Sequence, residues 1–299
     1  MKNDREQVEQ HYTQGRILDS ILGALRETGT DLARLTPEDL APVDEFHVRG
    51  REATVELARR ASLKPGSRVL DVGCGLRGSA RYLAAERQCR VTGIDLTQEY
   101  VDVANALADM VGLSDNVAFR QASALEIPFG DASFDVVWTQ HVQMNIADKR
   151  AFYLEIARVT RPKGLFLFHD IFRGDGGPLH YPVPWAEDPS ISFLAAPGEV
   201  RQILEDLGFV IHDWVDKTEP SLQWVVAAIE KVKVSGPPPL GPHLLMGDNA
   251  KTKLENAIRN LREGRFVVYQ ARAEKSNTVS KRLGRQLKSQ SSSSSEPGA

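Results

Sequence analysis

Two patterns of apolar and polar positions alternate along the middle of the chain. Short apolar runs such as VLDV at 69–72 and FDVVW at 134–138 predict buried strands, and apolar residues recurring every three or four positions predict helices. The predicted strands cover residues 68–73, 90–96, 116–123, 134–140 and 164–172, and the helices between them cover residues 79–86, 98–110 and 148–160. Apolar strands separated by helices indicate an α/β fold with a parallel sheet covered on both faces.

The flanking segments predict additions to this core. Residues 16–29 and 51–63 have helical spacing, and the segment 36–50 between them, which contains two prolines, predicts a loop. After the fifth strand, a long Gly- and Pro-rich stretch carries Tyr181, Trp185 and Phe193, which is typical of a lid or a substrate wall. Helices at 197–209, 220–233 and 249–264 and strands at 210–216 and 265–275 complete the pattern.

These elements predict three regions. We expect an N-terminal helical cap at 1–62 and a main domain at 63–275, with substrate-side insertions at 173–196 and 216–264. The tail at 276–299 is polar and rich in serine, so we expect it to be disordered.

Charge and composition favour a small-molecule partner. The 299 residues contain 37 Lys plus Arg and 40 Asp plus Glu, for a formal charge of -3, so no overall field attracts nucleic acid or an acidic membrane. The two cysteines, Cys74 and Cys89, are expected to be reduced thiols. No apolar run approaches the roughly 20 residues of a membrane span, so we expect a soluble cytoplasmic protein. The sequence does not indicate an oligomeric state.

The loop after the first strand has the strongest chemical signal. Gly73, Gly75 and Gly78 form G-x-G-x-x-G, a tight turn that lets the backbone approach either a dinucleotide such as NAD or the nucleoside of S-adenosylmethionine. Asp71 distinguishes these two ligands, because a carboxylate at the end of a buried strand is costly unless a cationic or hydrogen-bonding group meets it. The ammonium group of S-adenosylmethionine is such a partner. Asp95, which ends the next strand, is suited to accept both ribose hydroxyls.

Three further segments reach the same edge of the predicted sheet. Ser123 and Ala124 follow the third strand and are expected beside an adenine, and Gln140 and His141 follow the fourth. His169 and Asp170 end the fifth strand, where they face the pocket or hydrogen-bond a loop.

Together these segments resemble the class I S-adenosylmethionine-dependent methyltransferases. The matching motifs are VLDVGCGLRG, GIDLT, ALEIPF, FDVVWTQHV and RVTRPKGLFLF. The flanks resemble the subgroup of sarcosine and dimethylglycine N-methyltransferases, with tocopherol-type and ubiquinone-type C-methyltransferases as near relatives. The resemblance implies a seven-stranded, mostly parallel, doubly wound Rossmann-like sheet whose last strand is antiparallel. It also implies these contacts: Asp71, Gly73 and Gly75 with the methionyl part, Asp95 with the ribose, Leu96 with the adenine face, Ser123 and Ala124 with the adenine edge, and His141 beside the sulfonium.

Two positions depart from the family pattern. Arg77 replaces a common glycine, and its side chain is expected either to reach the methionyl carboxylate or to point to solvent. Ser123 stands where an acid is more frequent and would be a weaker, neutral partner for the adenine amino group. Tyr12 either folds over the cofactor or packs its helix. Asp44 and His47 have a metal-like spacing, but no third ligand is evident, so we expect no metal.

The leading hypothesis is in-line methyl transfer to a small acceptor, most simply an amine nitrogen as in glycine, sarcosine or dimethylglycine. His141 is the candidate for a catalytic proton acceptor. One alternative is C-methylation of a quinol, phenol or other lipid-like ring. Alternatives of another class are an NAD-dependent oxidoreductase, which the glycine pattern favours and Asp71 disfavours, and a cofactor-binding protein without transfer activity.

Overall fold

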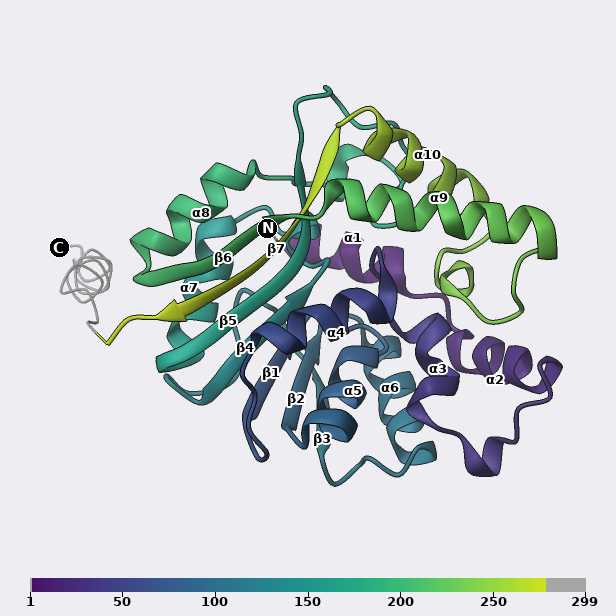
Figure 1. The fold of residues 1–299 in the computed structure, drawn as a ribbon, viewed down its shortest axis with the longest axis horizontal. Helices are drawn as coiled ribbons and strands as arrows, with labels where there is room; N and C mark the ends of the chain where they lie inside the picture. The colour runs from purple at the N-terminus through teal and green to yellow at the C-terminus, as the bar shows by residue number, and fades with distance from the viewer. Residues whose placement is uncertain (1, 278–299) are drawn as a thin grey trace, which may run out of the picture.

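A seven-stranded sheet forms the centre of the computed structural model, which describes residues 2–277 (Figure 1). The strands are β1 (Arg68–Val72), β2 (Arg90–Asp95), β3 (Val117–Gln121), β4 (Phe134–Gln140), β5 (Thr160–Arg173), β6 (Phe209–Asp216) and β7 (Phe266–Lys275). Their order is β3-β2-β1-β4-β5-β7-β6, and β7 is antiparallel to both of its neighbours while the other pairs are parallel. The predicted fold class, a mostly parallel doubly wound sheet with an antiparallel last strand, is confirmed.

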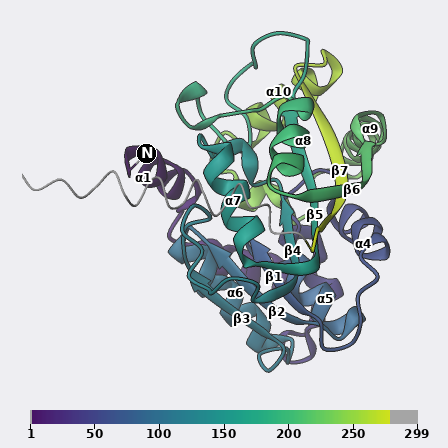
Figure 2. The ribbon, with the colours of Figure 1, turned by 90° about the vertical axis from the view of Figure 1, so that its left-hand side faces the viewer.

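Helices cover both faces of this sheet. They are α1 (Lys2–Tyr12), α2 (Ile17–Glu27), α3 (Pro37–Asp44), α4 (Gly50–Arg60), α5 (Gly78–Arg87), α6 (Gln98–Met110), α7 (Lys149–Val159), α8 (Pro197–Asp206), α9 (Thr218–Ser235) and α10 (Ala250–Arg262). On one face Leu57 of α4 and Leu83 of α5 join a buried cluster with Trp138. On the other face Phe152 of α7 and Leu204 of α8 pack in the second large cluster. Figure 2 shows α7 and α4 on opposite sides of the strands.

The chain changes direction next to β1. From β1 it moves to β2 and β3 on one side, and it then returns to place β4 on the other side of β1. At such a switch point the connections leave the strands in opposite directions, and the crevice that opens beyond the carboxyl ends is where ligands bind in open α/β sheets. The fold therefore predicts a ligand site at the carboxyl ends of β1, β2 and β4.

The segment between α2 and α4 differs from its prediction. Residues 36–50 were expected to be a loop because of two prolines, but α3 begins at Pro37. Proline suits the first turn of a helix, where its missing N–H has no intrahelical acceptor. The Thr36 hydroxyl accepts from Asp39 N, while the Asp39 carboxylate accepts from Thr36 N, and this capping box starts the helix.

The long insertion after β5 lies against the core. Residues 173–196 contain one short 3-10 turn (Pro189–Ile191), and Val183, Trp185 and Ala186 are buried. The second insertion, 216–264, contains α9 and α10, which pack together (Figure 1). The division at residues 62 and 63 stays a prediction, and most of the predicted tail, 278–299, lies outside the described residues. Within residues 2–277 no helix combines the length and the apolar character that a bilayer span requires.

Removing the hydroxyl that starts α3 tests this correction. We expect Thr36→Ala to lower the free energy of unfolding by about 1 kcal/mol, because Asp39 N loses its capping acceptor. Urea denaturation measures this change. Thr30→Ala is the control. It removes a hydroxyl that hydrogen-bonds the Thr28 hydroxyl and not a helix N–H, so the free energy of unfolding should change little. Equal losses in the two variants would show that the capping box contributes nothing.

Candidate active site

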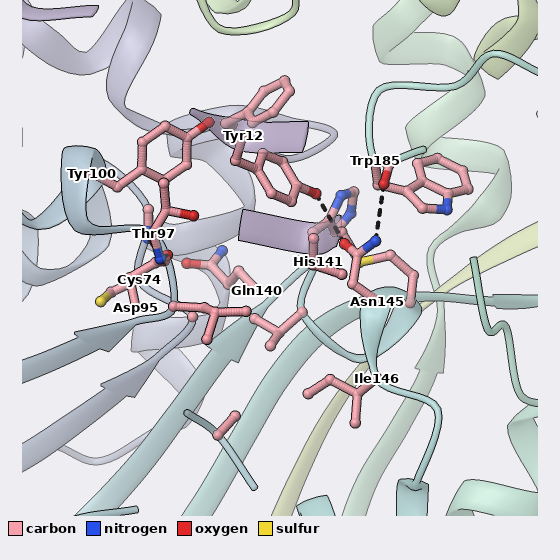
Figure 3. A pocket seen from close by; sticks show the side chains of 18 of the residues that line it. Tyr12, Cys74, Asp95, Thr97, Tyr100, Gln140, His141, Asn145, Ile146 and Trp185 are labelled. Atoms are coloured by element: carbon pink, nitrogen blue, oxygen red, sulfur yellow. Dashed lines mark hydrogen bonds between the residues drawn. The ribbon is translucent and has the colours of Figure 1, made fainter. Parts of the chain in front are cut away.

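A cavity of about 190 Å³ lies at the carboxyl ends of β1, β2 and β4. Its lining includes every residue expected from the sequence, namely Asp71, Gly73, Gly75, Asp95, Leu96, Ser123, Ala124, Gln140 and His141. Figure 3 shows Asp95, Thr97 and Tyr100 on one side of the cavity and His141, Asn145 and Trp185 on the other, with Tyr12 between them. The cavity therefore has a side formed by the first two strands and a side formed after β4.

The glycine loop is held tightly against β2. Gly73 has φ +65, and a Cβ atom there would lie 2.6 Å from a methyl carbon of Val142, so the position requires glycine for both reasons. The backbone N–H groups of Gly73 and Cys74 donate to the Ile94 carbonyl at 2.8 and 3.1 Å. Gly75 N donates to the Asp95 carboxylate at 2.8 Å. Three consecutive loop amides are thus already paired.

One buried and one half-buried carboxylate end the first two strands. Asp71 is 2% exposed, and its carboxylate accepts from the Ser79 hydroxyl at 2.6 Å. Burial raises the pKa of Asp71 from 3.8 to about 7, against the lowering effect of Ser79 and Arg77. Asp95 accepts from Gly75 N and from Thr97 N, and burial raises its pKa as well. Neither acid forms an ion pair within 4 Å in the described part of the chain.

Arg77 follows neither of the two expected directions. Its side chain is 0% exposed, so it does not point to solvent, and it is not among the cavity-lining residues. The guanidinium carbon lies 3.7 Å from the centre of the Phe119 ring, and Nε donates to the Gly75 carbonyl at 3.3 Å. Arg77 has φ +78, and this left-handed conformation accompanies the turn of its side chain beneath the loop.

The other predicted side chains differ in how free they are to bind. Ser123 Oγ accepts from Leu125 N at 3.2 Å. The Gln140 amide is occupied, because its Oε1 accepts from Trp138 Nε1 at 2.8 Å and its Nε2 donates to Thr54 Oγ1 at 3.1 Å. Gln140 therefore lines the cavity while its amide connects β4 to α4.

Three histidines meet where β4 and β5 end. The ring centroid of His141 lies 5.9 Å from that of His47 and 5.5 Å from that of His169, and His141 Nε2 has no hydrogen-bond partner among residues 2–277. Burial, with the neighbouring His169 and His47, lowers the pKa of His141 well below 6.5. The imidazole is therefore neutral at neutral pH and has one nitrogen free to accept a proton.

Asp44 and His47, which have a metal-like spacing, and His169 of β5 make contacts within the protein. Asp44 pairs with Arg81 at 2.9 Å, whereas His47 contacts Glu45 at 3.1 Å, so the two side chains do not converge. The described residues contain no group of three acids, histidines or cysteines suited to a metal ion. His169 Nε2 donates to the Val48 carbonyl at 3.0 Å.

Asp170 holds the loop that follows β4. Its carboxylate accepts from the backbone N–H groups of Val142, Gln143 and Ile171 at 2.9 to 3.2 Å. Burial raises the pKa of Asp170 to about 6. Of the two alternatives for this residue, the loop hydrogen bond is the one observed, and the carboxylate is not part of the cavity lining.

Asn145, which follows β4, connects α1 and the insertion 173–196 over the cavity. Its Oδ1 accepts from the Tyr12 hydroxyl at 2.9 Å, and its Nδ2 donates to the Trp185 carbonyl at 2.9 Å (Figure 3). Nδ2 also donates to the Ile191 carbonyl at 2.8 Å. Tyr12 thus lies over the cavity rather than serving only to pack its helix. Of the three insertion aromatics, Trp185 lines the cavity, whereas Tyr181 and Phe193 do not.

The connection that follows α1 is tied to α6. The backbone N–H groups of Gln14, Gly15 and Ile17 all donate to the Glu99 carboxylate, at 2.6 to 3.1 Å. His11 contacts the Pro184 carbonyl at 3.0 Å. These contacts hold α1 over the carboxyl ends of the strands.

Comparisons with known proteins identify the domain. Residues 70–168 match the family model described as a methyltransferase domain. The chain is 31% identical to the sarcosine/dimethylglycine N-methyltransferase of Halorhodospira halochloris, over 60% of this chain and 64% of that protein. It is 37% identical to a sterol 24-C-methyltransferase of Gibberella zeae, over 40% of this chain and 33% of that protein. The chain therefore carries a methyltransferase domain over residues 70–168.

One solved structure has the same overall fold as this chain. The phosphoethanolamine N-methyltransferase 2 of Haemonchus contortus, in complex with S-adenosyl-L-methionine, aligns with a TM-score of 0.66 at 20% identity. The alignment covers 81% of this chain and 58% of that chain. The chain spans no more than about two thirds of the length of the curated relatives described above. The resemblance inferred from the motifs is confirmed, and the NAD-dependent alternative gains no support from these relatives.

The cavity is also lined by residues that the sequence did not single out. Asn145 was missed, although a polar residue soon after β4 was a usable signal, and Phe46 and Tyr100 were missed because each lies on a helix or loop with an unremarkable pattern. The roles of the predicted residues in binding stay predictions.

The raised pKa of Asp71 predicts a pH-dependent stability. The folded state binds this proton more tightly than the unfolded chain, where the carboxyl titrates near 3.8. The stability that the neutral carboxyl contributes is therefore complete below pH 4 and is lost as the pH rises through about 7. Asp71→Asn stays neutral, so its advantage in unfolding free energy over the wild type should grow between pH 5 and pH 8.

Urea denaturation at the two pH values measures this difference. Asp102→Asn, which removes an exposed carboxylate on α6, is the control and should show no such growth. A stability difference between Asp71→Asn and the wild type that is the same at pH 5 and pH 8 would contradict the buried, high-pKa carboxyl.

Proposed function

We propose that this protein is an S-adenosylmethionine-dependent methyltransferase that acts on a small-molecule acceptor, most simply an amine nitrogen. The observation that carries the proposal is a pair of carboxylates, the buried Asp71 and the half-buried Asp95, at the rim of a cavity on the switch point of the sheet. Two acids without a cationic partner in contact are suited to a ligand that brings the positive charge. The family of the domain supports the same cofactor.

The residues present fit this cofactor better than a dinucleotide. A pyrophosphate binds through free backbone N–H groups, but the amides of Gly73, Cys74 and Gly75 are already donated to Ile94 and Asp95. A pyrophosphate on the loop would also lie near Asp71 and be repelled by it. In the proposal, the carboxylate of Asp71 meets the amino acid ammonium and that of Asp95 accepts from the ribose hydroxyls.

The remaining predicted contacts enclose the nucleoside. In the proposal, Leu96 packs on the adenine face, Ser123 and Ala124 lie at the adenine edge, and Gln140 supports the floor of the site. The bound cofactor supplies a methyl group on an already activated sulfonium carbon, so the protein has to orient an acceptor and exclude water. Tyr12, Asn145 and Trp185 close the acceptor side and serve both purposes.

The charge around the cavity favours an amine. The lining carboxylates are those of Asp4, Asp44, Asp71, Asp95 and Asp148, of which Asp44 is paired with Arg81. Arg5 is the one lining Arg or Lys in the described part of the chain. An acidic lining with the aromatic rings of Tyr12, Tyr100 and Trp185 stabilises an ammonium and repels phosphate groups. We therefore place amine acceptors ahead of phosphorylated ones, and Arg5 is suited to contact a single carboxylate on the acceptor.

A phenol or quinol is the second candidate acceptor. His141 is neutral, and its Nε2 is buried without a partner, which suits it to accept a proton from a hydroxyl. Val8, Met144 and Leu245 give part of the lining an apolar character that a ring would bury. A binding protein without transfer activity is less well supported, because Arg77 lies beneath the loop and leaves the cavity open. A cytoplasmic location stays a prediction.

Incubation with methyl-labelled S-adenosylmethionine and a metabolite extract tests the proposal. The account expects label in a small acceptor, with an amine-bearing compound preferred over its phosphorylated analogue. Label in a quinol or phenol would favour the second candidate. Absence of transfer to the extract and to a panel of amines, amino acids, quinols and phenols would contradict the proposed activity.

Asp95→Asn should weaken S-adenosylmethionine binding by about 10-fold or more, because the amide keeps one acceptor oxygen where the carboxylate serves Gly75 N, Thr97 N and the ribose. Isothermal titration calorimetry measures the dissociation constant. Asp135→Asn, a carboxylate at the start of β4 on the opposite edge of the sheet, is the control and should bind normally. Unchanged affinity in Asp95→Asn would remove Asp95 from the site.

His141→Asn tests the proton acceptor. We expect kcat to fall about 100-fold on an acceptor that must lose a proton, with a smaller change in cofactor affinity. Because the pKa of His141 lies well below 6.5, wild-type kcat should show no loss attributable to this histidine between pH 6.5 and 8. The control His180→Asn changes a ring that contacts Glu263 outside the cavity lining. Full turnover by His141→Asn would exclude it from catalysis.

A further inference from the structure

Arg77 is a buried cation without an ion pair. Its side chain is fully buried, and in the described part of the chain it has no carboxylate within 4 Å. Its Nη2 has no hydrogen-bond partner among residues 2–277. An isolated buried guanidinium is strongly unfavourable, so its surroundings must compensate for the lost hydration. Arg81, the neighbouring buried arginine on α5, has such compensation in its pair with Asp44.

The space around Arg77 is shaped to hold it. A Cβ atom at Gly93 of β2 would lie 2.9 Å from Arg77 Nη1 and 2.8 Å from the Phe119 ring, so glycine leaves the room that the guanidinium fills. The ring of Phe119 lies against the guanidinium at 3.7 Å, and the carbonyls of Gly75 and Gly93 accept from it at 3.3 and 3.5 Å. The charge is therefore fixed under the loop, on the side away from the cavity.

The charged groups near Arg77 belong to the proposed cofactor site. The anionic or ionisable groups that interact with it electrostatically are Asp71, Asp95 and the Cys74 thiol, and Arg81 opposes its charge. Asp71 and Asp95 line the cavity, whereas Arg77 does not. The arginine is thus placed to act on the cavity through the two acids and not by touching a ligand.

We propose that Arg77 is a positioning residue of the cofactor site: from beneath the glycine loop, its fixed charge keeps Asp71 and Asp95 ionised so that they bind the cationic cofactor. This inference rests on the proposed function. It assigns a role to a side chain that does not line the cavity, and it gives a reason for a buried arginine where a smaller residue would fit the turn with less desolvation.

Other charges around the two acids do not replace Arg77. Around Asp71, Ser79 and Arg77 favour the ionised form of the carboxyl, whereas Asp95 and Glu45 disfavour it. Around Asp95 the backbone N–H groups of Thr97 and Gly75 favour ionisation together with Arg77. Loss of the arginine charge therefore raises the pKa of Asp71 above its present value of about 7. A protonated Asp71 cannot pair with an ammonium.

The test is the pH dependence of S-adenosylmethionine binding in the full-length chain. In the wild type the dissociation constant should rise as the pH falls below about 7. In Arg77→Gln, which removes the charge and keeps a polar amide, that rise should begin about one pH unit higher. Binding by the variant should therefore be about 5-fold weaker than by the wild type at pH 7, about 10-fold weaker at pH 6, and equal to it near pH 9. Isothermal titration calorimetry measures both profiles.

Two variants separate charge from packing. Arg77→Lys keeps the charge and should keep the wild-type midpoint to within half a pH unit. Arg90→Gln removes an exposed arginine at the amino end of β2 and should leave the profile unchanged. If Arg77→Gln does not fold, the lysine variant decides, because a full-unit shift with the charge retained would overturn the proposal.

The outcomes also separate this inference from the proposed function. A loss of affinity in Arg77→Gln that is equal at pH 7 and pH 9, or no loss at all, would show that the arginine is merely structural. A wild-type protein that binds no S-adenosylmethionine at any pH would instead contradict the proposed function.

Discussion

The partial or full removal from water of two carboxylates at adjacent strand ends is the constraint on which the site depends. Asp71 is buried near the end of β1 and Asp95 is half-buried at the end of β2, so that an ionised carboxyl there loses hydration. The local structure compensates with hydrogen bonds from Ser79, Gly75 and Thr97. Because the loop amides are used in this way, the loop presents the acids to the cavity, and the site is matched to a ligand that carries positive charge and no phosphate.

The acceptor side is built from segments that are far apart in the sequence. Asn145 connects Tyr12 of α1 with the carbonyls of Trp185 and Ile191 in the insertion. Tyr12, which lies over the cavity, and the insertion around Trp185 are therefore joined by hydrogen bonds through Asn145. In the proposed methyl transfer, which depends mainly on alignment, such a fixed wall would help to orient the acceptor.

The sequence predicted the features that local pattern determines. Buried parallel strands leave near-continuous apolar runs, so the sheet could be predicted, and Asp71 and Asp95 were recognisable because each ends such a run. Helix α3 was missed because its prolines were given more weight than the Thr36 capping box. The direction of Arg77 could not be predicted, since it depends on space beside Gly93 in another strand.

The most direct test of the central claim is calorimetric titration of the purified protein with S-adenosylmethionine and, separately, with NAD, each followed by competition with the other. The account predicts that one S-adenosylmethionine binds per chain and that NAD neither binds nor competes. Binding of NAD that displaces S-adenosylmethionine, or is seen alone, would contradict a site built for a cationic nucleoside without phosphates.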